Sequence, residues 1–136
     1  MRDSQVQRLY DTSALLNLIL KGSGSLSVLQ EQTVLDLTIY ELGNSIWKIS
    51  HLQKKITKEE ACSLLEVCLT VRTNMKVMNI QGMEEEVKEL SADTGLSFYD
   101  SSYLALAKTH NLVLVTDDKR LARAATDCKI KTSTSE

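Results

Sequence analysis

Short apolar runs alternate along the chain with longer amphipathic stretches, and each pattern predicts a different kind of element. Short runs of apolar and β-branched residues are typical of buried strands. Stretches in which apolar residues recur every three or four positions are typical of helices that pack on one side. Strands are predicted at residues 8–10, 33–37, 77–80 and 112–115, and residues 129–131 can add an edge strand.

Helices are predicted in the stretches between these strands. In one of them, Ile39, Leu42 and Ile46 recur at helical spacing. Another is predicted to begin with a capping box, in which Thr57 and Glu60 satisfy each other's backbone N–H groups. The predicted helices cover residues 12–20, 38–52, 57–75, 83–92, 98–109 and 119–125, and a glycine-containing loop is predicted at 21–25.

The alternation of strands and helices predicts the fold class. Strand–helix–strand units connect by right-handed crossovers and build a mostly parallel sheet with helices on both faces. We therefore expect an α/β protein with four to five strands. The 136 residues suit one domain spanning residues 1–136, because nothing in the sequence marks a second one. The polar tail at 129–136 is expected to fray at its end.

Composition excludes several classes of protein. No apolar run approaches the roughly 20 residues that span a bilayer. The apolar stretch from Ala14 to Leu20 is interrupted by Asn17 and makes a poor signal peptide. The three cysteines lack CxxC spacing, so we expect buried, reduced thiols in a cytoplasmic protein. A net charge of −2 excludes a general polyanion binder, and 4% aromatic residues argue against a stacking platform for bases.

Four carboxylates far apart in the sequence each lie at the start of a predicted helix: Asp11, Glu41, Asp100 and Asp118. Asp11 and Asp118 also follow predicted strands. If those strands are parallel neighbours, the acids meet at one edge of the sheet, where sites form in such folds. Converging carboxylates repel one another unless a cation lies between them. The pattern therefore predicts a divalent metal such as Mg²⁺, which prefers hard oxygen ligands.

Helix capping offers a structural explanation for each acid taken singly. Glu41 and Asp100 lie three residues after Thr38 and Ser97, as in a capping box, and Asp11 and Asp118 can be N-caps. However, a hydroxyl that could cap equally well lies near every one of the four acids. Capping therefore does not require a carboxylate at these positions, which suggests that their negative charge has a function. These hydroxyls belong to Thr12, Thr38, Ser97 and Thr116.

Four segments around these acids resemble the motifs of PIN-domain ribonucleases, in the order of the family. They are LYDTSALL at 9–16, YELGNSIWK at 40–48, FYDSSYLALA at 98–107 and LVTDDKRL at 114–121. The length, without an accessory domain, is similar to that of VapC-type toxins of toxin–antitoxin pairs. The prolines often found near the second and third motifs of the family are missing here.

The resemblance implies a PIN-like three-layer α/β/α sandwich and a Mg²⁺- or Mn²⁺-dependent endoribonuclease. It implies that hydrolysis leaves a 5′-phosphate and a 3′-hydroxyl, without a catalytic histidine. It also implies an antitoxin partner and a homodimer. The four acids are the implied catalytic residues, with Asp11, Asp100 and Asp118 as metal ligands, Ser13 and Thr116 in support, and Asp117 as a rival to Asp118.

Several other side chains could contact RNA or a partner protein. Lys48 falls two helical turns after Glu41 on the same face. Lys119, Arg120 and Arg123 could hold RNA phosphates, or they could simply form a solvated helix face. In the helix at 57–75, Val67 and Val71 fall outside the main apolar face, which is consistent with core packing, a dimer interface or an antitoxin contact.

Three alternatives remain at the level of sequence. A PIN-fold nuclease of RNA processing would have the same fold and metal. A receiver-like signalling domain would also gather aspartates and Mg²⁺ at the end of a parallel sheet, although it would place an acidic pair after its first strand. A degenerate PIN fold would serve only as a binding scaffold, against which the presence of all four acids weighs.

Overall fold

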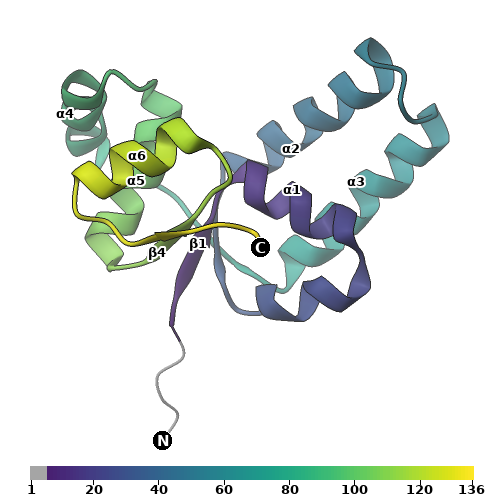
Figure 1. The fold of residues 1–136 in the computed structure, drawn as a ribbon, viewed down its shortest axis with the longest axis horizontal. Helices are drawn as coiled ribbons and strands as arrows, with labels where there is room; N and C mark the ends of the chain where they lie inside the picture. The colour runs from purple at the N-terminus through teal and green to yellow at the C-terminus, as the bar shows by residue number, and fades with distance from the viewer. Residues whose placement is uncertain (1–5) are drawn as a thin grey trace, which may run out of the picture.

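A five-stranded parallel sheet lies at the centre of the protein, for which a computed structural model describes residues 6–136 (Figure 1). The sheet order is β3-β2-β1-β4-β5, and every neighbouring pair of strands is parallel. The strands are β1 (Arg8–Tyr10), β2 (Thr33–Leu35), β3 (Lys76–Met78), β4 (Val113–Val115) and β5 (Thr132–Ser133).

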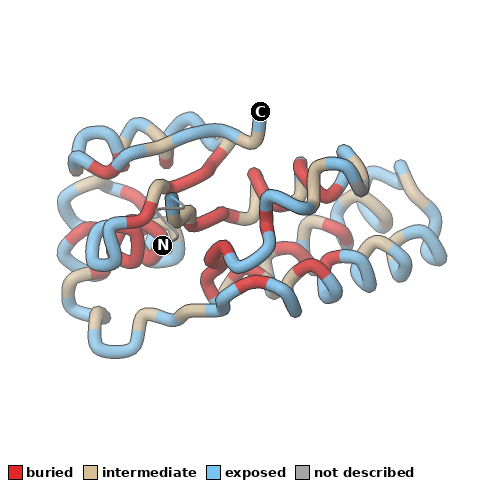
Figure 2. Tube along the Cα trace, turned by 90° about the horizontal axis from the view of Figure 1, so that it is seen from below, coloured by how far each residue is buried: buried red, intermediate tan, exposed pale blue. Residues whose placement is uncertain are grey.

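Three helices cover each face of the sheet, which confirms the predicted three-layer sandwich. Side chains alternate along a strand, so Leu9 and Leu114 face one core while Tyr10 and Val115 face the other. Buried residues follow the strands and the inner sides of the helices (Figure 2). The first core includes α4 (Glu84–Thr94), α5 (Phe98–His110) and α6 (Lys119–Asp127), and the second includes α1 (Thr12–Lys21), α2 (Thr38–Trp47) and α3 (Lys58–Thr73).

The strand order excludes the receiver-like alternative. Receiver domains of the flavodoxin-like type have the order 2-1-3-4-5, whereas the order here is 3-2-1-4-5. The chain builds outward from β1 through β2 and β3, and then returns to place β4 on the other side of β1. In parallel sheets, ligands bind beyond the carboxyl ends of the strands at such a reversal. Asp11 and Thr116, which directly follow β1 and β4, flank this point.

Three predicted segments differ at least in part from the structure. Residues 21–25 are not a simple loop, because a 3₁₀ helix, η1 (Ser23–Leu29), follows Gly22 and ends at the buried Leu29. The edge strand predicted at 129–131 begins instead at Thr132, since Lys129 takes a left-handed conformation with φ of 63° after α6. The predicted helix at 38–52 is present, but its last turn, η2 (Lys48–Leu52), is a π-helix.

The helix α3 confirms one prediction and decides between the alternatives left open for another. The Thr57–Glu60 capping box is formed in both directions, at 3.0 and 2.8 Å. Val71, however, belongs to the core, because it lies on the same side of the helix as the buried Cys68. The apolar side chains that α3 leaves exposed are Leu65, Val67 and Leu69.

The cysteines also differ from the expectation of three buried thiols. Cys68 is buried, Cys128 is half-buried and Cys62 is exposed, and all three are free. Cys62 lines an open groove that α3 forms with α2 and η2, where the apolar pattern of the sequence does not separate an exposed from a buried flank. No helix within residues 6–136 is long and apolar enough to cross a membrane.

Candidate active site

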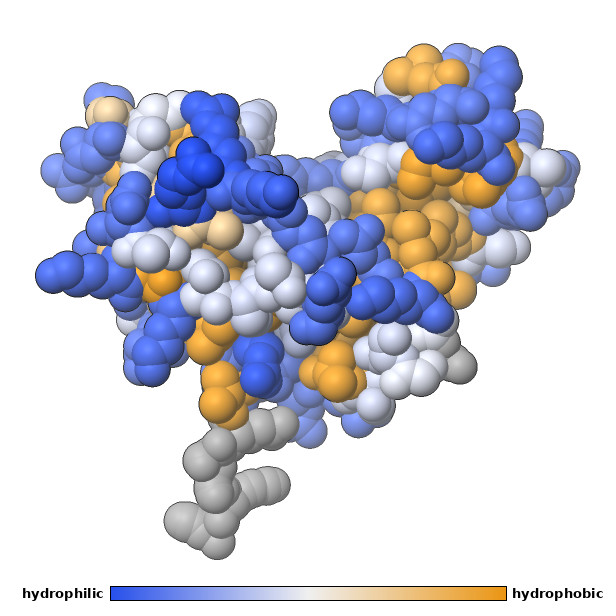
Figure 3. Space-filling model, in the orientation of Figure 1, coloured by the Kyte–Doolittle hydropathy of each residue, from blue (hydrophilic) through white to orange (hydrophobic). Residues whose placement is uncertain are grey.

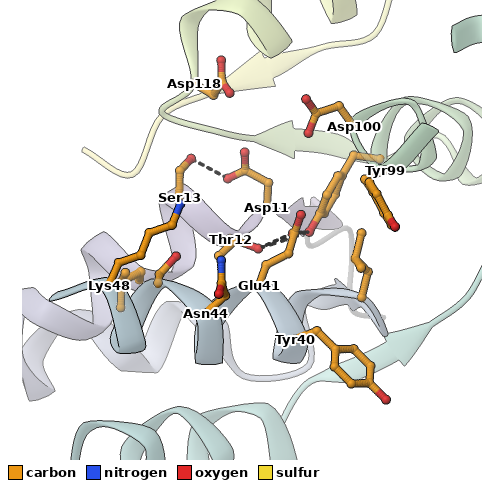
Figure 4. A pocket seen from close by; sticks show the side chains of 14 residues that line it. Asp11, Thr12, Ser13, Tyr40, Glu41, Asn44, Lys48, Tyr99, Asp100 and Asp118 are labelled. Carbon is orange, nitrogen blue, oxygen red and sulfur yellow. Dashed lines mark hydrogen bonds between the residues drawn. The ribbon is translucent and has the colours of Figure 1, made fainter. Parts of the chain in front are cut away.

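All four predicted acids line one pocket of about 510 Å³ at the carboxyl end of the sheet (Figure 4). The pairing of β1 with β4 brings the first and last motifs together. Tyr10 lies opposite Val115, and the Asp11 N–H donates to the Val115 carbonyl at 3.1 Å. One residue further on, the Thr116 hydroxyl donates to Oδ2 of Asp11. The sheet register therefore fixes this contact across 105 positions of sequence.

Asp11 is buried and caps the first helix. Its Oδ1 accepts hydrogen bonds from the Ser13 hydroxyl at 2.8 Å and from the Ala14 N–H at 2.9 Å. Burial raises the pKa of Asp11, the hydrogen bonds from Thr116, Ala14 and Ser13 oppose this, and the charge of Asp118 adds to the rise. Asp11 therefore both caps α1, as predicted, and lines the pocket.

Asp118 combines the same two roles. Its Oδ1 accepts from the N–H groups of Arg120 at 2.9 Å and Leu121 at 3.1 Å, which caps α6. Its own N–H donates to the Thr116 hydroxyl at 3.0 Å. Because the Thr116 hydroxyl also donates to Asp11, this one side chain links the turn after β4 to the end of β1.

Glu41 does not form the predicted capping box with Thr38. The N-cap of α2 is Leu37, and the buried Thr38 hydroxyl instead contacts the Tyr103 hydroxyl at 2.8 Å. Oε1 of Glu41 accepts from Thr12 at 2.6 Å and from the Tyr103 hydroxyl at 2.7 Å. Tertiary hydrogen bonds, unlike a local cap, hold this carboxylate in the pocket.

Tyr103 is a site residue that the sequence did not single out. It is 2% exposed and lies on α5, one turn after Asp100. Desolvation raises its pKa, and the charge of Glu41 adds to this effect. Its position in the third motif, three residues after an acid, is the one signal that places its hydroxyl on the same helix face as the site.

Asp100 forms only half of its predicted capping box. Its N–H donates to the Ser97 hydroxyl at 3.0 Å, but its carboxylate accepts no hydrogen bond from any residue in 6–136. Burial raises the pKa of Asp100, the charges of Asp118 and Glu41 raise it further, and Arg120 opposes them. Local structure therefore explains the main chain of this residue and leaves its charged group unexplained.

Asp117 points away from the pocket. Its carboxylate accepts from the Ser135 N–H at 2.8 Å, the Ser135 hydroxyl at 2.6 Å and the Asn17 amide at 2.6 Å. Burial alone would raise the pKa of Asp117, but these hydrogen bonds and the charge of Lys21 outweigh it and lower the pKa. The tail that was expected to fray is bound here, while Asp118 lines the pocket.

The predicted basic residues divide into two groups. Lys48 lines the pocket, as its spacing from Glu41 suggests. Lys119, Arg120 and Arg123 do not line it, and Arg120 donates to the Gly95 carbonyl at 3.2 Å. Among the residues that line the pocket without having been predicted are Asn44, Ser45, Tyr40 and Tyr99.

The donor set fits a hard divalent cation. Within residues 6–136 no three acidic, histidine or cysteine side chains are close enough together to form a complete cage. Mg²⁺ does not need one, because it keeps several waters and commonly takes one or two carboxylates together with substrate phosphate. Asp100 has both oxygens free of protein hydrogen bonds, and Asp118 and Glu41 each have one. The negative charges of these carboxylates repel one another in the pocket, and a bound cation would relieve this repulsion.

Comparisons with known proteins agree with this geometry. The PIN domain family model matches residues 8–127. A protein of Pyrobaculum aerophilum named exonuclease VapC9 is 34% identical over 116 residues, which are 85% of this chain and 84% of the relative. Ribonuclease VapC3 of the same organism is 32% identical over 99 residues, covering 72% and 74% of the two chains.

Solved structures give the same fold. The crystal structure of PAE2754 from Pyrobaculum aerophilum has a TM-score of 0.76 and 31% identity, with 94% of this chain and 83% of that one covered. A chain of a toxin–antitoxin complex from Klebsiella pneumoniae has a TM-score of 0.57 at 20% identity, with 85% and 90% covered, and supports the fold alone. The chain belongs to the PIN-domain family, in its VapC-type branch.

Proposed function

We propose that this VapC-type PIN protein is a Mg²⁺- or Mn²⁺-dependent endoribonuclease, the toxin of a toxin–antitoxin pair. The single observation that supports this most strongly is the free carboxylate of Asp100. It lies in a pocket with three other acids, it accepts no hydrogen bond within residues 6–136, and its pKa is raised by burial and by the charges of Asp118 and Glu41. A structural residue would gain nothing from this environment, whereas a metal ligand would.

Asp11, Asp100 and Asp118 are the proposed metal ligands, and Glu41 completes the acidic set. A bound divalent cation supplies charge stabilisation on the phosphate and lowers the pKa of a water. Ser13 and Thr116 orient Asp11 through hydrogen bonds to its two oxygens. The structure adds Thr12 and Tyr103, which orient Glu41 through hydrogen bonds to its Oε1. Lys48, which lines the pocket, attracts substrate phosphate.

The test is substitution of Asp100 by Asn, with cleavage of a single-stranded RNA as the measurement. Asp100→Asn removes charge where no side-chain hydrogen bond is lost, so the fold should be unaffected. We expect cleavage to fall by more than about 100-fold, since even residues behind a metal ligand change activity by about 10- to 100-fold. Asp11→Asn is the less clean choice, because Asn keeps the cap but presents an NH₂ group to the donating Thr116 hydroxyl.

Asp93→Asn is the matched control, because Asp93 is exposed on α4 and lies outside the pocket. A circular copy of the RNA distinguishes internal cleavage from digestion at ends, and the products should carry 5′-phosphates and 3′-hydroxyls. Cleavage by Asp100→Asn at the rate of Asp93→Asn would overturn the metal site. A wild-type protein that cuts no RNA with Mg²⁺ or Mn²⁺ would favour the degenerate scaffold.

We propose that the antitoxin and the second subunit of the homodimer bind to the helices α2 and α3. Figure 3 shows apolar surface gathered over the part of the molecule that α1, α2 and α3 form. On α3 the exposed apolar side chains are Leu65, Val67 and Leu69. Exposed apolar surface of this kind marks protein partners. We propose that the protein works in the cytoplasm as a homodimer. Light scattering that compares the mass of wild type with that of Val67→Glu tests the dimer.

A further inference from the structure

Two exposed tyrosines each directly precede an acid of the site. Tyr40 precedes Glu41 on α2, and Tyr99 precedes Asp100 on α5. Both line the pocket, and they are 78% and 61% exposed. A tyrosine also precedes an acid at the end of β1, where Tyr10 is 4% exposed and belongs to the core. The exposure of Tyr40 and Tyr99 is therefore a feature of their place on two helices and not of the sequence pattern.

Neither core packing nor a hydrogen bond gives the rings of Tyr40 and Tyr99 a structural role. Neither belongs to the two hydrophobic cores, and neither hydroxyl makes a hydrogen bond within residues 6–136. Burial of an aromatic side chain is one of the larger favourable terms available to a protein. Two such side chains held open at the mouth of one pocket are available to a ligand.

The pocket is divided by chemical type. Figure 4 shows Tyr40 and Tyr99 on the same side of the acids, while Lys48 lies on the other side. Leu37 also lines the pocket and adds apolar surface. A ligand that fits this division carries an anionic group beside a flat unsaturated ring, which describes one nucleotide unit. The anionic group would lie between the acids with their cation and Lys48, and the ring would lie against a tyrosine.

We propose that Tyr40 and Tyr99 form an aromatic shelf that stacks on bases next to the scissile phosphate of single-stranded RNA. This inference rests on the proposed function and adds to it the side chains that contact the bases. Bases within a duplex already stack on one another and cannot turn onto a protein ring, whereas unpaired bases can. Stacking tolerates any base, because every base has a π-face. The shelf therefore selects unpaired RNA without fixing its sequence.

An RNA base is a better occupant of the shelf than a protein side chain. Tyr40 and Tyr99 line the same pocket as the four acids, so a ligand on either ring lies in the pocket that holds the acids. Phe98 beside Tyr99 is also exposed, but the exposed apolar side chains of α3, Trp47 and Leu52 do not line this pocket. Aromatic residues are only 4% of the chain, yet three of the four tyrosines line this one pocket.

The test measures binding and cleavage separately. Binding is measured by fluorescence anisotropy with Asp100→Asn, which is not expected to cut, carrying Tyr40→Leu, Tyr99→Leu or both. The probe is a labelled single-stranded oligoribonucleotide with a mapped cut site, and matched copies have an abasic residue at each flanking position. Leu keeps apolar volume and removes the ring, and Phe restores the ring without the hydroxyl.

We expect each Leu variant to bind the complete oligonucleotide roughly tenfold more weakly, in line with alanine substitution of stacking residues. The Phe variants should recover binding. The oligonucleotide with an abasic residue at the stacked position should bind Asp100→Asn equally well with and without the Leu changes, a coupling that a merely structural role for the tyrosines would not produce. In the cleaving protein, the same Leu changes should raise KM more than they lower kcat.

Three results would overturn the shelf: equal binding by the Leu variants, a Phe variant as weak as Leu, or a loss in the Leu variants that persists on every abasic copy. Each of them leaves the proposed nuclease activity intact, because wild-type cleavage is measured beside them. Failure of the wild type to cut RNA would instead count against the proposed function, on which the shelf rests.

Discussion

Replacing Tyr103 by Phe removes one hydroxyl from the centre of the site and should destabilise the protein. Each of the hydroxyls around Glu41 has a single proton. Those of Thr12 and Tyr103 both go to Oε1 of Glu41, so Thr38 must donate to the Tyr103 oxygen. The 3.3 Å contact between Thr12 and Tyr103 then has no proton left to share. Tyr103→Phe therefore breaks two hydrogen bonds and leaves the Thr38 hydroxyl without an acceptor.

The size of the effect follows from burial and charge. A hydrogen bond to a charged group contributes about 1.5–3 kcal/mol, and a buried donor that loses its acceptor costs about 1–3 kcal/mol. Glu41 is half-buried and keeps its bond from Thr12, which lowers the first contribution. We expect a loss of about 2 kcal/mol in the free energy of unfolding. For 136 residues this corresponds to a fall of about 7 °C in melting temperature.

Urea unfolding of wild type and Tyr103→Phe at 25 °C measures this loss directly. Tyr10→Phe is the control, since Tyr10 is also buried but its hydroxyl makes no hydrogen bond within residues 6–136, and its effect should stay below about 0.5 kcal/mol. Thr38→Val in the Tyr103→Phe background should cost little more, because its partner is already lost. A Tyr103→Phe effect equal to that of Tyr10→Phe, or strict additivity with Thr38→Val, would refute the proton assignment.

Mg²⁺ or Mn²⁺ at ten times its dissociation constant should raise the melting temperature of the wild type by about 5 °C, and Asp100→Asn should lose this rise; an equal rise in both would remove Asp100 from the metal site. Asp117→Ala should release Ser135 to limited proteolysis and keep the metal-induced rise, whereas loss of the rise would make Asp117 a ligand. Iodoacetamide at pH 8 should label exposed Cys62 in the native protein and spare Cys68, because burial raises the pKa of Cys68 to about 11. Mass spectrometry measures the labelling at each cysteine, and equal labelling at both would contradict the burial of Cys68.

Local signals were sufficient to predict the fold. The strand-like run before Asp11 and the one at 112–115 are short and apolar, and the Thr57–Glu60 box fixes the start of its helix without tertiary help. The failures lie where a local rule competes with distant contacts. Thr38 and Glu41 match the capping box in sequence, but Tyr103 reaches both side chains from α5 and takes them out of it.

The site divides in the same way. The four acids could be found from the sequence because each lies at an element boundary that local patterns reveal. The sequence favoured Asp118 but left Asp117 as a rival, since the orientation of Asp117 depends on Ser135 and Asn17, which approach from the tail and from α1. The exposure of Tyr40 and Tyr99 was equally hidden, because composition averages over the chain and says nothing about where three tyrosines meet.

The contact between Asp11 and Thr116 determines when, during synthesis of the chain, the acidic site can form. The two residues are 105 positions apart, and β4 must insert beside β1 before they meet. Such long-range pairing forms late, after most of the chain is available. A ribosome-bound chain that has not yet exposed residues 113–118 lacks Asp118, Thr116 and the ladder that places Asp11. A site that needs these residues is thus complete only after residues 113–118 have left the ribosome.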